Sequence, residues 1–131
     1  MIHEILPVGM LQCNCSILGD ESTREAIVID PGDDIATVMS LVSRHGLTVK
    51  TIVVTHAHID HTGWLPRLVA QGFNGPIYCT GGTADLCQLV LPDAAHIQEE
   101  DAKFANSRGF SKHQPALPLY TGEDAAEALS R

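Results

Sequence analysis

The sequence lacks the features that mark membrane, secreted and nucleic-acid-binding proteins. No apolar run reaches the roughly 18 residues that suggest a transmembrane helix, and the first residues do not show the basic and then apolar pattern of a signal peptide. Basic residues are few, because 8 Lys and Arg stand against 16 Asp and Glu, a formal net charge of -8. Electrostatic capture of long nucleic acid needs clustered Lys and Arg. We therefore expect a cytoplasmic protein with no membrane partner and no long nucleic-acid partner.

Cysteine pairs with metal-binding spacing are also missing. None of the four cysteines, Cys13, Cys15, Cys79 and Cys87, forms a C-x-x-C pair of the zinc-ribbon kind. In an intracellular chain the thiols stay reduced, and nothing in the surrounding sequence would lower a thiol pKa. We therefore expect all four cysteines to be small buried hydrophobic side chains.

Length and patterning indicate one α/β domain over residues 1–131. With 44% hydrophobic residues, the chain can build a core. Short apolar runs predict strands at residues 5–8, 13–18, 25–29, 51–54 and 76–79. Helical spacing predicts helices at residues 35–45, 63–71, 84–91, 93–108 and 125–129, with Asp33 or Asp34 and Thr83 as N-caps. Strands that alternate with helices are typical of layered α/β folds.

Four potential metal ligands fall within six residues, directly after the strand predicted at 51–54: His56, His58, Asp60 and His61. Alternate side chains at a strand end point the same way, so His56 and His58 can hold one ion. Asp60 and His61 then swing toward a second position as the backbone turns into a helix. Imidazoles with a carboxylate suit zinc or a similar divalent ion, with manganese or iron as alternatives. A histidine-rich surface turn is the other interpretation.

Two residues near this stretch allow two interpretations each. Asp30 ends the strand predicted at 25–29 and precedes Pro31 and Gly32. Its carboxylate can lie beside a metal site or cap the turn, and taken by itself the turn cap is favoured. Trp64, next to the ligands, can line a pocket or pack in the core.

The pattern His-x-His-x-Asp-His after an apolar strand resembles the hallmark motif of the metallo-β-lactamase superfamily. The resemblance implies a two-metal hydrolase built as an αββα sandwich. It places His56 and His58 at the first metal, and Asp60 and His61 at the second. In this scheme Asp60 also orients the reacting water, which makes it the candidate catalytic residue.

Two branches of the superfamily are resembled by different parts of the chain. Residues 1 to about 61, with LPVG at 6–9, QCNC at 12–15 and AIVIDPG at 26–32, are similar to glyoxalase II-like thioester hydrolases. Residues from about 56 to 129, with HTGWLP at 61–66, HIQEEDA at 96–102 and LPLYT at 117–121, are similar to β-CASP RNA-processing nucleases. The pattern indicates a chimera, natural or constructed, joined near residues 56–61.

The resemblance covers half of the family sandwich. Both branches supply a further His and a bridging Asp from segments beyond those matched here. One face of the sheet would then be apolar and open, so we expect a homodimer that rebuilds the sandwich across a two-fold axis. The missing ligands would come from the partner, from water or from the charged segment at 93–113, where His96, Glu99, Asp101 and His113 are candidates. Solvated helix positions are the other interpretation of those four residues.

These features predict a metal-dependent hydrolase for a small anionic ester. A divalent ion at the ligand stretch would polarise an ester oxygen and lower the pKa of a water molecule toward about 7. The β-CASP resemblance favours phosphodiesters, and the lack of a cap and a basic groove favours small ones over long RNA. Thioester hydrolysis of the glyoxalase II kind is the alternative, and a non-catalytic metal-binding dimer or inert fragment is the second alternative.

Overall fold

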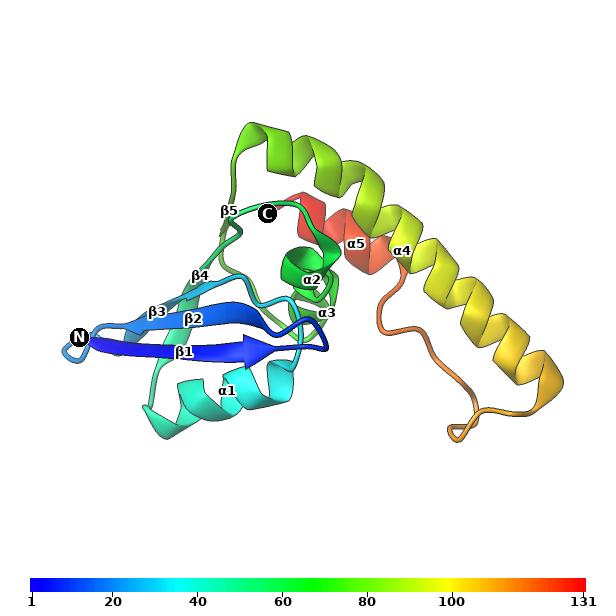
Figure 1. Cartoon of the computed structure of the whole chain (residues 1–131), viewed down its shortest axis with the longest axis horizontal. Helices are drawn as coiled ribbons and strands as arrows, with labels where there is room; N and C mark the ends of the chain where they lie inside the picture. Colours follow the sequence, from blue (N-terminus) through cyan, green and yellow to red (C-terminus); the bar gives the residue numbers. More distant parts are fainter.

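The computed structural model describes residues 1–131 as one five-stranded sheet with helices packed against it (Figure 1). The strands are β1 (Ile2–Val8), β2 (Cys13–Gly19), β3 (Glu25–Ile29), β4 (Thr48–Val53) and β5 (Ile77–Tyr78). They lie in sequence order in the sheet. The pairs β1–β2 and β2–β3 are antiparallel, and the pairs β3–β4 and β4–β5 are parallel. The α/β class predicted from the sequence is confirmed.

The helices are α1 (Ile35–Arg44), α2 (Ile59–Thr62), α3 (Leu65–Ala70), α4 (Gly81–Arg108) and α5 (Gly122–Leu129). Helix α1 is the crossover between the parallel strands β3 and β4, and α2 with α3 makes the crossover to β5. The far part of α4 projects away from the sheet (Figure 1). None of these helices has the length and apolar character needed to cross a membrane.

Three clusters of buried side chains form the core. The largest lies between the sheet and α1 and comprises Leu6, Val8, Cys15, Ile17, Ala26, Val28, Val38, Val42 and Leu47. The second joins α4 to α5 and comprises Ala57, Cys87, Leu91, Ala95, Tyr120 and Ala125. The third places Leu65 of α3 against Ile52 and Val54. Because Val28 and Ile52 are paired neighbours on one face of the sheet, α1 and α3 cover the same face.

The opposite face of the sheet is open. The strand registers align Ile5, Ser16, Ile29, Val53 and Tyr78 in one row across all five strands. At the two ends of this row, Ile5 is 59% exposed and Tyr78 is 60% exposed. The open apolar face predicted for a half sandwich is therefore present. The homodimer that would cover it stays a prediction.

Some element boundaries differ from the predicted ones. The helices predicted at 84–91 and 93–108 are one helix, α4, which continues through Pro92 although proline removes one backbone hydrogen bond. Its N-cap is Thr80, whose hydroxyl accepts a hydrogen bond from the Thr83 backbone, so the cap predicted at Thr83 is wrong. Asp34 does occupy the N-cap position of α1, but its carboxylate accepts from Gly9 N instead of from its own helix.

Candidate metal centre

The ligand stretch lies where the parallel strands β3 and β4 end. Ile29 pairs with Val53 at the end of both strands, so residues 30–32 and 54–58 leave the sheet side by side. Short helix α2 then begins at Ile59, with His58 as its N-cap residue in an extended conformation. A turn from strand to helix was predicted from the sequence, but the helix was expected to begin at residue 63. It begins at Ile59 instead, and this places Asp60 and His61 in the first helical turn.

The three histidines of the motif gather at one point. The ring centroid of His56 lies 4.0 Å from that of His61 and 4.7 Å from that of His58. His56 and His61 are half-buried, whereas His58 is exposed. The three rings therefore lie close together, but the group of donor atoms that all lie within 4.8 Å of one another includes His61 and neither His56 nor His58. The role of these residues as metal ligands stays a prediction.

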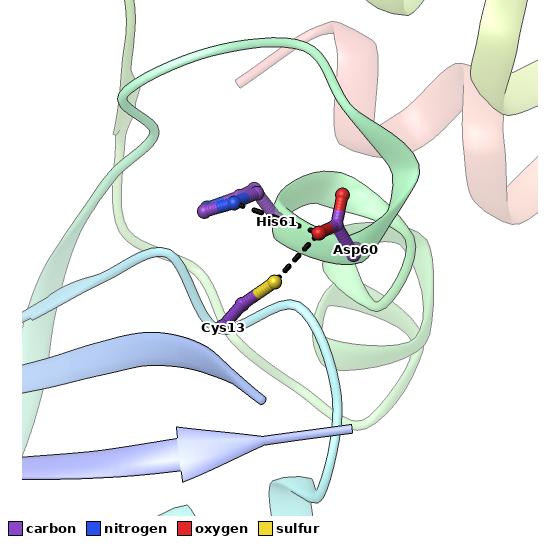
Figure 2. Close-up of side chains that lie close together, drawn as sticks. All are labelled: Cys13, Asp60 and His61. Atoms are coloured by element: carbon purple, nitrogen blue, oxygen red, sulfur yellow. Dashed lines mark hydrogen bonds and ion pairs between the residues drawn. The ribbon is translucent and has the colours of Figure 1, made fainter. Parts of the chain in front are cut away.

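Asp60 lies next to His61 and contacts Cys13, a residue that was not predicted to belong to the site. Its Oδ2 atom lies 3.7 Å from Nε2 of His61 and accepts a hydrogen bond of 2.6 Å from the Cys13 thiol (Figure 2). One donor atom from each of these three residues lies within 4.8 Å of the others. Cys13 is the first residue of β2, so the sheet contributes directly to the site.

Asp30 connects the end of β3 to the residues that follow β4 and to His61. The Asp30 carboxylate is buried and accepts hydrogen bonds from the backbone N (2.8 Å) and the hydroxyl (2.7 Å) of Thr55. Its Oδ2 also lies 3.1 Å from Nδ1 of His61. The turn-cap interpretation of Asp30 is therefore wrong, because its carboxylate binds the next strand end and faces a ligand.

These contacts determine which nitrogen of His56 is free. The Thr55 hydroxyl has one proton, which it donates to Asp30, so it accepts at 2.9 Å from Nδ1 of His56. Nδ1 thus carries the ring proton, and Nε2 keeps the lone pair that a metal needs. Outer hydrogen bonds of this kind fix the tautomer of metal-binding histidines.

Gly32 allows the two loops to meet. A Cβ atom at Gly32 would lie 1.6 Å from the carbonyl oxygen of Asp60 and 2.8 Å from the Cα atom of His61. No side chain fits there, so the backbone of α2 rests directly on the turn after β3. Asp30 itself has a φ of 52°, a left-handed conformation that non-glycine residues adopt at a cost. The local backbone is therefore shaped to hold Asp60 and His61 in place.

The donor set fits a divalent metal ion. Imidazole, carboxylate and thiol groups are the ligands that zinc and similar ions use in proteins. Nδ1 of His61 is buried and has no hydrogen-bond partner of good geometry, which is unusual for a buried polar atom. His56, His58, Asp60 and His61 are the residues that would hold the ion, with Cys13 beside them.

The charges at the site act on its titratable groups. The hydrogen bond from Cys13 lowers the pKa of Asp60 from its ordinary value, and His61 and His58 act in the same direction. The same hydrogen bond, with burial and the negative charges of Asp60 and Asp30, raises the pKa of the Cys13 thiol to about 11. Asp60 is therefore an ionised acceptor, and the cluster as a whole attracts positive charge.

Comparison with known proteins shows the family to which the chain belongs. The sequence profile of the "Metallo-beta-lactamase superfamily" matches residues 8–120. The chain belongs to the metallo-beta-lactamase superfamily. It is therefore a member of a group of metal-dependent hydrolases that bind divalent ions.

Relatives by sequence include proteins that act on RNA or in transcription. An uncharacterized protein of Aquifex aeolicus is 41% identical over 78 residues, which cover 60% of this chain and 36% of that protein. The transcription termination factor FttA of Methanococcus maripaludis is 46% identical over 55 residues, covering 42% and 9%. Ribonuclease TTHA0252 of Thermus thermophilus is 36% identical over 81 residues, covering 62% and 15%. The matched part is thus about a third or less of each relative.

Solved structures of the superfamily share the fold over nearly the whole chain. The BLEG-1 B3 metallo-beta-lactamase has a TM-score of 0.55 and 27% identity, covering 92% of this chain and 49% of that one. TTHA1623, solved in a di-iron-bound form, has a TM-score of 0.55 and 26% identity, covering 90% and 52%. The chain therefore spans about half the length of these superfamily members.

The further ligands suggested from the charged segment do not join the superfamily site. His96 is exposed on α4 and His113 is exposed in the connection from α4 to α5, and neither belongs to the ligand group. Glu99 accepts a hydrogen bond from Gly122 N, and Asp101 is exposed. The structure thus places these four residues as helix and loop residues of the surface, because α4 runs past the site and away from the sheet.

Sequence reasoning did not place Cys13 at the site, and for Asp30 it favoured the turn cap over the position beside the metal site. Of the four cysteines predicted as buried hydrophobes, Cys15 and Cys87 are buried, Cys79 is exposed and Cys13 is partly buried in the site. The relevant signal was the position of Cys13 and Asp30 at strand ends. That signal becomes specific when the strand order is known, because the ends of β2, β3 and β4 then meet.

A pocket of about 290 Å³ opens beside Asp60. Trp64 lines it, so the pocket interpretation of this residue is confirmed. The rest of the wall is mostly apolar and includes Met10, Leu11 and Tyr120, and no Lys, Arg or His contributes to it. Asp60 is the one residue of the predicted ligand set that lines this pocket.

Proposed function

We propose that the protein is a metal-dependent hydrolase that cleaves small phosphodiesters with a metal-activated water. The observation that carries this proposal is the convergence of His56, His58, Asp60 and His61 at the ends of β3 and β4. A divalent ion bound there, with zinc favoured and manganese or iron as alternatives, would supply Lewis acidity and a water of lowered pKa.

The residues of the chain hold the reacting groups in place. Asp60 is ionised and half-buried, so it can accept a hydrogen bond from the reacting water and orient that water toward the substrate. Asp30 and Thr55 fix the ring of His56, and Asp30 also faces His61. The buried turn at Gly32 is in direct contact with the backbone of Asp60 and so fixes the position of α2 relative to Asp30. Catalysis depends on such positioning of the reacting groups.

Small phosphodiesters suit both the relatives and the charge of the site. A ribonuclease is among the sequence relatives. The net charge of -8 and the lack of basic side chains in the pocket disfavour long RNA. Since Asp33 and Asp60 are the charged residues of the pocket wall, an anionic substrate would depend on the bound metal for attraction.

Thioester hydrolysis is the second candidate, and the apolar pocket favours it. Val8, Met10, Leu11 and Trp64 could receive an acyl or thiol group that carries less charge than a phosphodiester. A non-catalytic metal-binding dimer is the remaining alternative. In that case the chain would bind metal but show no turnover of either substrate.

The test is hydrolysis of a chromogenic phosphodiester and of a glutathione thioester by the same metal-loaded protein. The variants His58→Ala and Asp60→Ala should lose turnover by about 100-fold or more, because each removes a group that holds or orients the reactants. His96→Ala is the matched control and should keep wild-type turnover. Activity that survives in both His58→Ala and Asp60→Ala would show that the site is not responsible for it.

A further inference from the structure

Cys13 is placed as a ligand would be, and it is not placed as a core residue. Its thiol is partly buried and points at Asp60 from the first residue of β2, as Figure 2 shows. The neighbouring cysteine on the same strand face, Cys15, is fully buried among aliphatic side chains and contacts no ligand. The two cysteines therefore serve different purposes although they are two residues apart.

The surroundings of the Cys13 sulfur favour a cation. Asp60 Oδ2 lies 2.6 Å away, and the carboxylates of Asp60 and Asp30 both act on the thiol electrostatically. A ring nitrogen of His61 lies within 4.8 Å of both the Cys13 sulfur and an Asp60 carboxylate oxygen. A thiol, a carboxylate and an imidazole, three groups that bind divalent metal ions in proteins, therefore come together at one point.

We infer that Cys13 is a metal ligand, and that it binds the ion held by Asp60 and His61. The inference rests on the proposed metal-dependent function. Binding releases the thiol proton to solvent and forms a sulfur–metal bond, since the thiolate is the form that coordinates metals. The sheet thereby supplies a third protein donor at the second metal position.

Three protein donors leave a coordination position open, which is the arrangement of catalytic rather than structural zinc sites. A thiolate is also a soft ligand, and it favours zinc, iron or cobalt over manganese and magnesium. Cys13 would thus determine which metal the site prefers. Carboxylate and imidazole ligands without the thiolate would discriminate less among these ions.

Cobalt(II) titration followed by absorption spectroscopy tests the inference with the metal alone. Thiolate ligation produces a charge-transfer band in the near ultraviolet, whereas cobalt bound by any ligands in a tetrahedral site produces bands in the visible range. Wild type should show both. Cys13→Ser should keep the visible bands but lose the charge-transfer band. Its zinc affinity should fall by at least about tenfold, because even the mutation of residues that only support the ligands of a metal site lowers affinity by that much.

Cys79→Ser is the matched control, because Cys79 is an exposed cysteine outside the site. It should give the wild-type spectrum and the wild-type zinc affinity. Circular dichroism of each variant shows whether it is folded. Should Cys13→Ser fail to fold, a cadmium complex of the wild type with its sulfur-to-metal absorption, compared with Cys79→Ser, gives the same readout.

The outcomes separate this inference from the proposed function. Visible cobalt bands without a charge-transfer band in the wild type would overturn the role of Cys13 and leave the metal site standing. A charge-transfer band that persists in Cys13→Ser would also overturn it. No cobalt spectrum at all would overturn both the inference and the proposed function.

Discussion

Two regions of the molecule have cores of different size and composition. The sheet half, residues 1–54, buries nine side chains between the strands and α1, and most of them are large aliphatic groups. The helical half, residues 81–129, packs around a smaller cluster in which Leu91 is the one large aliphatic side chain and the others are mainly alanines. Much of α4 beyond that cluster is exposed, including Ile97 and Phe104.

The metal centre lies between these halves, and the difference shows which of them supports it. Cys13 and Asp30 reach the ligands from the ends of strands in the sheet half, and Asp30 accepts a hydrogen bond from Thr55, which directly follows that half. The helical half contacts the motif mainly through Ala57 and the packing of α4 on α2. We therefore expect the site to depend strongly on the sheet half and weakly on the helical half.

The largest effect should come from closing the space at Gly32. Gly32→Ala puts a Cβ within 1.6 Å of the Asp60 carbonyl oxygen, so α2 must move off the turn after β3. Zinc binding should be lost and the free energy of unfolding should fall by more than about 3 kcal/mol, at or beyond the upper end for overpacking. Isothermal titration with zinc and chemical denaturation would measure both.

Gly81→Ala is the control for that experiment, because no atom lies within 4 Å of its Cβ position. It should leave zinc affinity and stability nearly unchanged. Wild-type zinc affinity in Gly32→Ala would contradict the account of how the two loops are held together.

Matched cavities in the two cores should differ in cost. Ile17→Ala in the sheet half should reduce the free energy of unfolding by about 4 kcal/mol, and Leu91→Ala in the helical half by about 2 kcal/mol. Both side chains are buried, but the surroundings of Leu91 can relax toward solvent more easily. Urea denaturation of the two variants measures these changes. An equal or greater loss of unfolding free energy for Leu91→Ala would contradict the expectation that the core of the helical half relaxes more easily.

The open face of the sheet permits a sharper test of the predicted homodimer. Ile27 is 39% exposed on that face, in the row next to Ile5 and Tyr78. If two chains pack sheet on sheet, light scattering should give the mass of a dimer for the wild type and of a monomer for Ile27→Lys. Leu89→Lys, an exposed site on α4, should remain dimeric, and a monomeric wild type would refute the dimer.

The smallest effect is expected in the charged segment of α4 and the connection after it. His96→Ala and His113→Ala should change zinc affinity by less than about twofold, since both side chains are exposed and lie outside the ligand group. A loss of tenfold in either variant, measured by competition with a zinc indicator, would mean that one of these histidines reaches the metal.

Much of the fold could be predicted because its signals are local. The apolar runs that predict strands at 13–18 and 25–29, and the helical spacing that predicts a helix at 35–45, agree with β2, β3 and α1. Continuity of α4 through Pro92 was not predicted, because proline usually ends a helix and tertiary packing of Leu91 and Ala95 overrides that preference.

In the site, too, the sequence indicated the residues that are close together along the chain and not those that are far apart. His56, His58, Asp60 and His61 are close in sequence, so a single turn from strand to helix brings them together. Cys13 lies 47 residues from Asp60, and Asp30 lies 25 residues from Thr55. Their approach depends on strand order and on the close contact at Gly32, and neither can be derived from local spacing.

The most direct test of the central claim is metal content in purified wild type and in Asp60→Ala, measured by mass spectrometry of the elements. The account predicts one to two divalent ions per chain in the wild type, with zinc preferred, and a clear loss of metal in Asp60→Ala. A wild type that folds as described but retains no ion after exposure to zinc would contradict it.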